Sequence, residues 1–395
     1  MNKNILTSEV QLFIQNNLKA DINKLIFKGS PFDTISIQEL VNQILAKQKA
    51  EKKLPTWFQT DLIYYPSKLS IEQTSSEITA KYKASLIKGN SLIDLTGGFG
   101  VDTFYFSKNF TSVTHCEINS ELSTLVNYNY SLLKATNIET IAIDGIEYLK
   151  NIEKQFDCIY IDPSRRSDIK GKVFLLKDCL PNVPEHLDFL FSKSNIILIK
   201  NSPILDISSA ISELKHVKEI HIISLKNEVK ELLFLLEKEY VDGIEIKTHN
   251  ILDTTVDIFS FEKDSSPTIT YSLPQHYLYE PNAAILKSGG FAHVSEQLKV
   301  AKLHQHSHLY TSEELIANFP GRLFLIEKVF KYNKKLIKKE ITEKQANITT
   351  RNFPKSVEQL RKETKLKDGG TTYLFFSTDL NNDLIVIKCK KINSQ

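Results

Sequence analysis

A group of glycines and carboxylates in the first half of the chain could together hold a nucleotide. The group consists of Asp94, Gly97, Gly98, Gly100 and Glu117. Glycines have no Cβ, so the backbone can approach a ligand closely, and the N–H groups of a helix that starts there point into the same space. The carboxylate of Glu117 follows the next expected strand, where it can accept both hydroxyls of a ribose.

The spacing of the glycines separates two kinds of nucleotide ligand. A dinucleotide fingerprint needs G-x-G-x-x-G, but Thr103 stands where its third glycine belongs. The order D-x-x-G-G-x-G instead resembles motif I of class I S-adenosylmethionine-dependent methyltransferases. The resemblance implies that Asp94 lies near the methionine ammonium, the glycines lie beneath the methionyl part, and Glu117 binds the ribose. A tight turn without any ligand also uses glycine, and this alternative stays open at this point.

Residues on either side of the glycine turn extend the expected cofactor site. Ser75 lies in a run of hydroxyl residues, Thr74 to Ser76, that precedes an expected helix. Such residues are typical N-caps, but the resemblance implies that Ser75 faces the methionine carboxylate of the cofactor. Asp144 and Gly145 close the third expected strand, a position from which such proteins hold the adenine amino group.

A fourth acidic residue, Asp162, closes the next expected strand and is followed by Pro163 and Ser164. Methyltransferase relatives have D-P-P or N-P-P and an aromatic residue here, which hold and stack the base that is methylated. Ser164 replaces the second proline and Arg165 the aromatic residue, so no ring is supplied for stacking. We expect Asp162, which also borders the cofactor, and the backbone of Pro163 and Ser164 to hold an N–H of the acceptor and receive its proton.

Alternating strands and helices must position these residues. Apolar runs predict strands at 91–95, 112–116, 139–143, 156–161, 194–200 and 218–224. Helical spacing predicts helices at 101–109, 119–134, 175–192 and 205–214. A further apolar run at 231–237 has no room for a crossover helix before it, which predicts an antiparallel seventh strand in a hairpin with the sixth. The alternating runs within 239–263 indicate a short extension of this sheet.

Composition and length bound the class of protein. A chain of 395 residues is expected to form two or three domains, and 41% hydrophobic with 25% charged residues is typical of globular proteins. The sequence has no run of 18 apolar residues and no signal-peptide core near its start, which predicts a cytoplasmic protein without a membrane span. The four cysteines are far apart, which indicates a reducing compartment and no zinc site.

Positive charge is concentrated in the C-terminal third. Residues 271–395 hold 20 Lys and Arg against 12 Asp and Glu, and the segment from Lys331 to Lys367 holds 12 against 4. This asymmetry favours a polyanionic partner, although a solvated lysine-rich helix face is an alternative. His304, His306 and His308 would share one face of a strand, but no fourth ligand is evident, so we expect no metal site.

Several stretches resemble a bacterial family of class I methyltransferases that carries a C-terminal THUMP-like domain. They are EQTSSEITAKYKA, DLTGGFGVDT, IDPSRR, KNSPILD, YLYEPNAAILKSGG, LYTSEEL, FPGR and NITTRNFP. The expected fold is α/β, with a Rossmann-like seven-stranded methyltransferase sheet and a small C-terminal α/β domain. The implied boundaries are 1–88 for an N-terminal helical region, 89–264 for the methyltransferase domain, 272–318 for a ferredoxin-like region and 319–395 for the THUMP-like domain.

The same resemblance implies the function. The protein is expected to transfer a methyl group from S-adenosyl-L-methionine to RNA, either tRNA or rRNA, with the basic segment from Lys331 to Lys367 as the RNA contact. Two alternatives remain from the residues alone. The acceptor could be a protein or a small molecule, or the methyltransferase fold could serve as the scaffold of a non-catalytic RNA-binding protein.

Overall fold

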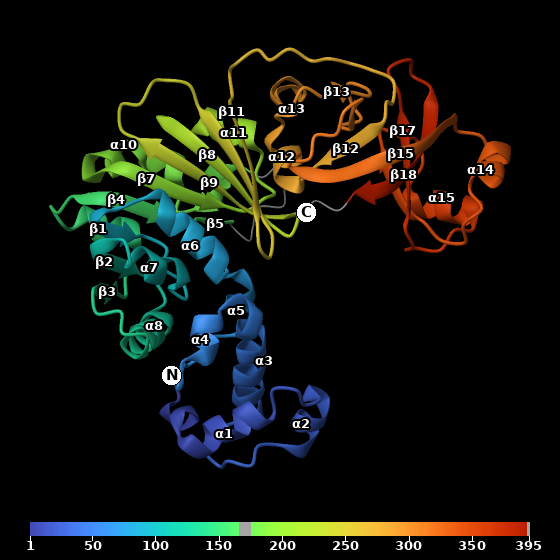
Figure 1. Ribbon diagram of the computed structural model, residues 1–395. Coiled ribbons are helices and arrows are strands. Elements are labelled where there is room, and N and C mark those ends of the chain that lie inside the picture. The colour runs from blue at the N-terminus through green and yellow to red at the C-terminus, as the bar shows by residue number, and fades with distance from the viewer. Residues whose placement is uncertain (166–174, 393–395) are drawn as a thin grey trace. The chain divides into compact units, whose positions relative to one another are not determined.

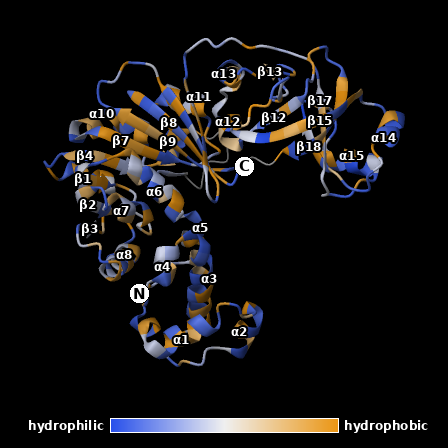
Figure 2. Ribbon diagram, viewed as in Figure 1, coloured by the Kyte–Doolittle hydropathy of each residue, from blue (hydrophilic) through white to orange (hydrophobic). Residues whose placement is uncertain are grey.

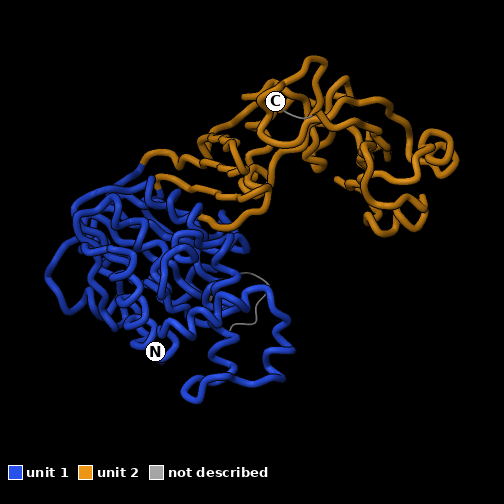
Figure 3. Tube along the Cα trace, turned by 60° about the horizontal axis from the view of Figure 1, so that its bottom comes forward, with its two compact units in different colours: residues 1–217, 233–241 blue, residues 218–232, 242–395 orange. Residues whose placement is uncertain are grey.

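The computed structural model describes residues 1–165 and 175–392. The chain divides into two compact units (Figure 3). The first unit consists of residues 1–217 and 233–241, and the second of residues 218–232 and 242–395. Each unit is described by itself below.

The first unit begins with helices, as the spacing of apolar residues predicts. They are η1 (Lys3–Leu6), α1 (Ser8–Asn16), α2 (Ile22–Lys28), α3 (Ile37–Lys53), α4 (Pro55–Gln59), α5 (Lys68–Gln73) and α6 (Glu77–Leu86). Helix α3 starts with a capping box: the Ser36 hydroxyl accepts the Glu39 N–H at 3.2 Å, and Glu39 accepts the Ser36 N–H at 2.9 Å. Leu40 and Ile44 on its inner face are fully buried, so the helical region has a core of its own.

A nine-stranded sheet follows, in the order β11-β10-β8-β9-β7-β4-β1-β2-β3 (Figure 1). Strands β10 and β11 and most of β8 belong to the second unit, and the other strands lie wholly or partly in the first. Its strands are β1 (Gly89–Asp94), β2 (Phe110–Cys116), β3 (Ile138–Ile141), β4 (Phe156–Ile161), β7 (Ser194–Asn201), β8 (Val217–Leu225), β9 (Glu228–Glu237), β10 (Glu245–Ile251) and β11 (Val256–Glu262). Neighbouring strands from β3 to β7 are parallel. Their carboxyl ends therefore meet at one edge, where ligands bind in such sheets.

The expectation of seven strands is wrong for the complete sheet, because β10 and β11 extend it. Strand β10 pairs parallel to β8, and β11 returns antiparallel to β10. Both strands alternate buried and more exposed residues over part of their length, the pattern of strands with one buried face. The two alternating runs within 239–263 therefore form full members of the sheet.

The predicted hairpin of the sixth and seventh strands is confirmed as β8 and β9. Only Lys226 and Asn227 connect these neighbouring strands, with φ angles of 50° and 66°. Two positive φ angles are the signature of a tight hairpin turn between antiparallel strands. The middle of β9, residues 232–236, is buried throughout and is largely hydrophobic in Figure 2. It therefore sits in the interior of the sheet rather than at its edge.

Helices between the strands lie close to their predicted positions, except that one starts later than predicted and the helix at 145–150 was not predicted. They are α7 (Val101–Phe106), α8 (Ser120–Leu132), α9 (Gly145–Lys150), α10 (Val183–Lys193) and α11 (Ile207–Glu213). The helix predicted at 175–192 starts only at Val183, after η2 (Leu176–Asp178) and the short strand β6 (Cys179–Leu180), which pairs with β5 (Ser164–Arg165). Pro181 prevents an earlier start because a proline within a helix removes a backbone donor and clashes with the preceding turn.

The second unit contains a seven-stranded sheet in the order β13-β14-β12-β15-β18-β17-β16. Its strands are β12 (Tyr277–Pro281), β13 (Ala301–Lys302), β14 (Tyr310–Ser312), β15 (Gly321–Lys331), β16 (Asn347–Arg351), β17 (Thr372–Thr378) and β18 (Leu384–Ile392). Its helices are α12 (Ala283–Ser288), α13 (Phe291–Gln297), α14 (Lys334–Glu340) and α15 (Val357–Thr364).

Within the described residues, no helix has the length and hydropathy needed to cross a membrane.

Candidate cofactor and acceptor site

The glycine turn after β1 requires glycine for reasons within the fold itself. Gly98 and Gly100 have φ angles of 56° and 77°, which side chains disfavour. A Cβ at Gly97 would lie 2.2 Å from Nε2 of His115, and one at Gly100 would lie 2.1 Å from the Tyr130 hydroxyl. The glycines therefore show how the turn is built, and the evidence for a ligand has to come from the side chains around it.

Asp94 ends β1 as an almost completely buried carboxylate beside this turn. Its Oδ2 accepts the Thr103 hydroxyl at 2.6 Å, and its Oδ1 accepts the Thr96 N–H at 3.0 Å. Burial and, to a smaller extent, the nearby carboxylates of Asp102 and Asp162 raise the pKa of Asp94 to about 7, against the lowering effect of its two hydrogen bonds. A cation placed beside Asp94 would offset both effects, so this side chain suits an ammonium group.

Glu117 follows β2 and lies directly against the turn. Its Oε2 accepts the Gly98 N–H at 2.9 Å, and its Oε1 accepts the Asn119 N–H at 2.7 Å. These two bonds fix the orientation of the carboxylate. Each oxygen keeps a lone pair for a ligand hydroxyl, so Glu117 can bind a diol such as that of a ribose.

Asp144 and Gly145 follow β3, and Gly145 lies against Leu95, the residue after Asp94. A Cβ at Gly145 would lie 2.5 Å from the carbonyl oxygen of Leu95. The Asp144 carboxylate caps α9, with Oδ1 accepting the N–H groups of Ile146 at 2.9 Å and Glu147 at 3.1 Å. The structure thus brings Asp144 to the same edge as Asp94 and leaves Oδ2 without a bond to the helix.

Asp162 follows β4 and joins this group through the turn. Its N–H donates to the Thr96 hydroxyl at 2.7 Å, and Thr96 in turn donates to Asp94. The ammonium of Lys200, on β7, contacts Oδ2 of Asp162. The Asp162 side chain is 35% exposed and that of Lys200 is 14% exposed, so the pair borders solvent. Lys200 belongs to the KNSPILD stretch but was not among the predicted site residues.

The two residues after Asp162 differ in their surroundings. Pro163 is buried, whereas Ser164 is exposed and begins β5. Ser164 pairs with Leu180 of β6, so the chain leaves the sheet edge in a two-stranded ribbon. Arg166, the last residue of the IDPSRR stretch, lies outside the described residues.

Ser75 belongs to a buried polar network below the glycine turn. Its hydroxyl donates to Oδ2 of Asp102 at 2.8 Å and accepts from Lys83 at 3.0 Å. Lys83, which has no exposed side-chain surface, lies 3.2 Å from Oδ1 of Asp102, and the Tyr160 hydroxyl donates to Oδ2 at 2.8 Å. The observed partners of Ser75 are therefore Asp102 and Lys83.

Neither Lys83 nor Asp102 was predicted as a site residue. Asp102 lies within the D-x-x-G-G-x-G-V-D stretch, so its position was a possible signal. Lys83 gives no such signal, because a lysine in a polar helix usually faces solvent. Lys83 and Lys200 both lower the pKa of Asp102, against the opposing effect of burial.

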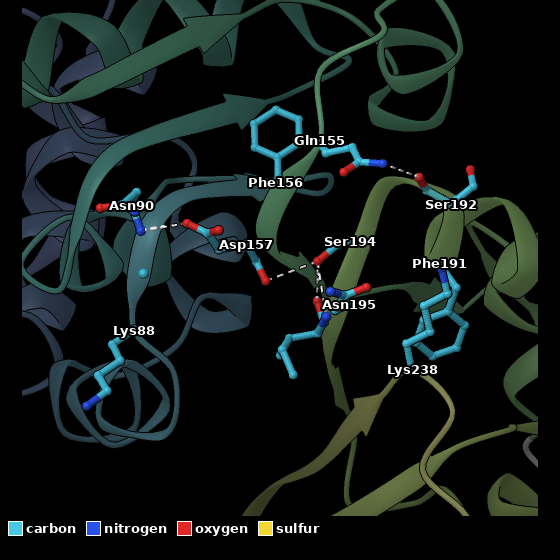
Figure 4. Close-up of a pocket in the computed structure, with 12 residues that line it drawn as sticks. Lys88, Asn90, Gln155, Phe156, Asp157, Phe191, Ser192, Ser194, Asn195 and Lys238 are labelled. Carbon is cyan, nitrogen blue, oxygen red and sulfur yellow. Dashed lines mark hydrogen bonds between the residues drawn. The ribbon is translucent and has the colours of Figure 1, made fainter.

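One hollow in the first unit lies away from this site. It has a volume of about 480 Å³ and is shown in Figure 4. Its lining includes Gly89, Phe156 and Ser194, the first residues of β1, β4 and β7. It therefore lies at the amino ends of the parallel strands, whereas the glycine turn, Glu117 and Asp162 follow the carboxyl ends. A second hollow, of about 370 Å³, includes Asn119 in its lining, two residues after Glu117.

Two of the three alternating histidines, His304 and His308, contact other side chains of the second unit. Nδ1 of His304 lies 3.0 Å from Nδ2 of Asn352, and Nε2 lies 3.2 Å from Oδ1 of Asn382. His308 stacks on Phe291, with 3.6 Å between ring centroids. Among the described residues, no group of three His, Cys, Asp or Glu side chains could hold a metal ion.

The basic segment separates into paired and unpaired cations. Four of its twelve Lys and Arg residues form ion pairs: Lys331 with Asp383, Arg351 with Glu280, Lys355 with Glu363 and Arg361 with Asp368. The other eight are exposed and lack an ion pair with any described residue; they are Lys334, Lys335, Lys338, Lys339, Lys344, Lys362, Lys365 and Lys367. Lys331 is the last residue of β15, whereas Lys334, Lys335, Lys338 and Lys339 lie on α14.

Comparison with known proteins places this arrangement in a family. A family model for a ferredoxin-like domain matches residues 277–320, and one described as THUMP domain-like matches residues 321–391. A crystal structure from Porphyromonas gingivalis W83, titled as that of a "putative methyltransferase", is 31% identical with a TM-score of 0.88, and the match covers 99% of both chains.

Shorter matches involve curated RNA methyltransferases. Ribosomal RNA small subunit methyltransferase J of Francisella tularensis subsp. holarctica is 33% identical over 94 residues, which cover 22% of this chain and 37% of that protein. The enzyme of the same name from Coxiella burnetii is 33% identical over 79 residues, or 18% of this chain and 31% of that protein. The chain thus spans about a third of the length of these relatives. Because the match to the Porphyromonas gingivalis protein is complete, the chain belongs to the family of class I methyltransferases that carry a ferredoxin-like and a C-terminal THUMP-like domain.

Proposed function

We propose that this protein is an S-adenosylmethionine-dependent methyltransferase that acts on RNA. The observation that carries the proposal is the contact between Glu117 and the glycine turn, since the Gly98 N–H holds the carboxylate at 2.9 Å where a ribose would bind. Asp94, buried beside the same turn with a raised pKa, suits the methionine ammonium. The ribose and the ammonium of one ligand thus have chemically matched partners, Glu117 and Asp94, at the same glycine turn.

The remaining cofactor contacts follow from this placement. The backbone of Gly97, Gly98 and Gly100 would lie against the methionyl part, because no Cβ intervenes. Oδ2 of Asp144 would accept the adenine amino group, since Oδ1 already caps α9. Ser75 would border the methionine carboxylate, with its hydroxyl held in place by Asp102 and Lys83.

Methyl transfer asks the protein mainly for placement. The sulfonium of S-adenosylmethionine supplies an activated methyl group, so the chain must hold the acceptor in line at about 3 to 3.5 Å from it. Asp162, with the backbone of Pro163 and Ser164, would hold an N–H of the acceptor and receive its proton. Lys200 keeps the Asp162 carboxylate oriented through their ion pair.

RNA is the proposed acceptor for two reasons. The curated relatives act on small-subunit ribosomal RNA according to their names. The second unit also carries eight exposed lysines without an ion pair to any described residue, a surface suited to phosphates. Small-subunit rRNA is therefore the first substrate to test, followed by tRNA.

The decisive experiment combines binding with transfer. Calorimetric titration of the full chain with S-adenosylmethionine should give saturable binding, with NAD as the negative control. Labelled cofactor should then be incubated with rRNA and tRNA from a strain that lacks the protein. Label in RNA supports the proposal; RNA binding without transfer identifies a non-catalytic scaffold, and binding of NAD in place of the sulfonium would overturn the cofactor assignment. Mass spectrometry of nucleosides from the same strain would identify the modified position.

A further inference from the structure

A buried glutamate in the second unit holds two arginines. Glu280, on β12, is 3% exposed. Arg322 lies directly opposite it on β15; its Nε donates to Oε2 of Glu280 at 2.5 Å, and its Nη2 contacts the same oxygen. Arg351, the last residue of β16, donates from Nη2 to Oε1 at 2.7 Å. Each carboxylate oxygen is therefore bound by a different guanidinium.

Charge balance does not require both arginines. A buried carboxylate needs one cation to compensate its charge, so the second guanidinium leaves the group with a net charge of about +1. The Arg322 side chain is 37% exposed and that of Arg351 is 35% exposed, so both can reach a ligand. Neither has a further carboxylate partner among the described residues.

Both guanidinium groups are also held in fixed planes. Arg351 donates from Nη1 to the carbonyl of Thr350 at 3.0 Å, and the guanidinium of Arg322 lies 5.6 Å from the centre of the Phe324 ring. Contacts of this kind lower the loss of side-chain freedom when a ligand binds. At Arg322, Nη1 makes no bond to Glu280, and at Arg351 the same holds for Nε, so donors remain available.

The surroundings are positive as well. Burial, together with the nearby charges of Lys302, His306 and Arg351, lowers the pKa of His308 to about 4. Lys302 is itself buried, with its ammonium 2.8 Å from the carbonyl of Gln305. Lys302 and His306 therefore act on His308 together with Arg351, which indicates a region of positive potential around this arginine.

We propose that Arg322 and Arg351, oriented by Glu280, form a binding site for a phosphate of the RNA backbone. A guanidinium offers parallel N–H donors that match two oxygens of one phosphate, which a lysine does not. The inference rests on the proposed RNA substrate and adds a defined contact to it. The exposed lysines supply general attraction, whereas the arginine pair fixes where one phosphate lies.

The test uses the full chain and a fluorescein-labelled single-stranded oligouridylate, with binding followed by anisotropy over a range of salt concentrations. Arg351→Gln and Arg322→Gln should each bind about tenfold more weakly, and the slope of log affinity against log salt should fall by about 0.7. Arg351→Lys keeps the charge and the ion pair, so it should keep the slope but bind more weakly than the wild type. It also serves if a glutamine variant does not fold.

Two further variants separate orientation from charge. Glu280→Gln raises the net charge by one but releases the arginines, so we expect weaker RNA binding; tighter binding would contradict the orienting role. Arg361→Gln is the matched control, because Arg361 is a partly exposed arginine of the same unit that pairs with Asp368. It should bind RNA as the wild type does.

The outcomes distinguish this inference from the proposed function. If the wild type binds or methylates RNA while the Arg322 and Arg351 variants, with unchanged unfolding temperatures, bind as the wild type, only the phosphate site is overturned. If the wild type binds no RNA, both proposals fail. Inorganic phosphate should compete only weakly; full competition at low concentration would instead identify a site for free phosphate and would overturn the assignment to RNA.

Discussion

Lys200 and Asp162 form an ion pair at the carboxyl ends of β7 and β4, beside the turn that holds Asp94. We expect Asp162→Ala to lower kcat about a hundredfold or more, the usual effect of losing an acid–base group. Lys200→Met should lower kcat less and leave the cofactor Kd unchanged, and Lys200→Arg should restore part of the loss. Single-turnover methyl transfer measures both. Unchanged turnover in Asp162→Ala would exclude this carboxylate from the reaction.

Glu117 should determine cofactor affinity. Removal of a charged hydrogen-bond acceptor costs about 1.5 to 3 kcal/mol, so Glu117→Ala should weaken S-adenosylmethionine binding about ten- to hundredfold by calorimetry. Glu121→Ala, four residues further along and exposed, is the control and should bind normally. Equal affinity of both variants would show that the ribose lies elsewhere.

Asp94 should make cofactor binding depend on pH. Its pKa of about 7, raised by burial from 3.8, means that the free protein carries it mostly protonated below neutrality. If the ammonium binds the ionised form, affinity should rise about five- to tenfold between about pH 6 and about pH 7.5. Calorimetry in buffers of different ionisation enthalpy should detect the released proton, and Asp94→Asn should abolish both effects.

The raised pKa of Asp94 also affects the stability of the fold. Stability should fall as pH rises, whereas cofactor affinity should increase. Between about pH 4 and pH 7 the folded protein keeps a proton on Asp94 that the unfolded chain has lost, so this group makes the fold less stable as pH rises through that window. The unfolding temperature of Asp94→Asn should therefore fall less over this range than that of the wild type. A larger fall in the variant would contradict the raised pKa.

Lys83 and Asp102 should be strongly coupled in stability. Lys83→Met leaves a buried carboxylate without its cation, which typically costs about 3 to 5 kcal/mol. The double variant Lys83→Met, Asp102→Asn should recover much of this loss, because no unpaired charge remains. Urea unfolding of the wild type, of Lys83→Met, of Asp102→Asn and of the double variant, followed by a probe in the first unit such as Trp57, measures the coupling. Additive losses would mean that the pair contributes little.

The exposed lysines of α14 should contribute RNA affinity without affecting the cofactor. Replacement of Lys334, Lys335 and Lys338 by Gln should weaken RNA binding and lower the salt slope by about 2, at about 0.7 for each phosphate contact. The cofactor Kd should stay constant, because Asp94 and Glu117 belong to the other compact unit. The matched control replaces three lysines that already have carboxylate partners, Lys331, Lys355 and Lys390. Equal effects of the two triple variants would refute the distinction.

Local patterns in the sequence predicted most of the first sheet. Periodicity located its strands, and the short distance between the sixth and seventh runs predicted the hairpin that Lys226 and Asn227 form. The predicted start of α10 was wrong because the prediction followed the apolar spacing and ignored the helix-breaking effect of Pro181. The sheet was predicted too small because the two alternating runs within 239–263 were interpreted as a short extension and were not counted among its strands.

Local patterns could not predict contacts between residues that are distant in sequence and meet only in the folded protein. Lys200 and Asp162 are 38 residues apart in sequence, and no local pattern reports an ion pair over that distance. Lys83 resembles a solvent-exposed helix residue until its burial is known. Apart from Ser75, the site residues that were predicted share a simple property: each follows the carboxyl end of a strand or lies in a recognisable glycine motif.

Gly97 and His115 occupy one shared volume. The imidazole of His115 is fully buried beneath the turn, in the space that any side chain at position 97 would need. The two positions should therefore covary among relatives: a protein with alanine at the position of Gly97 should carry a smaller residue at that of His115. The second strand thus limits which sequences the cofactor turn can tolerate, even though His115 itself would never contact the ligand.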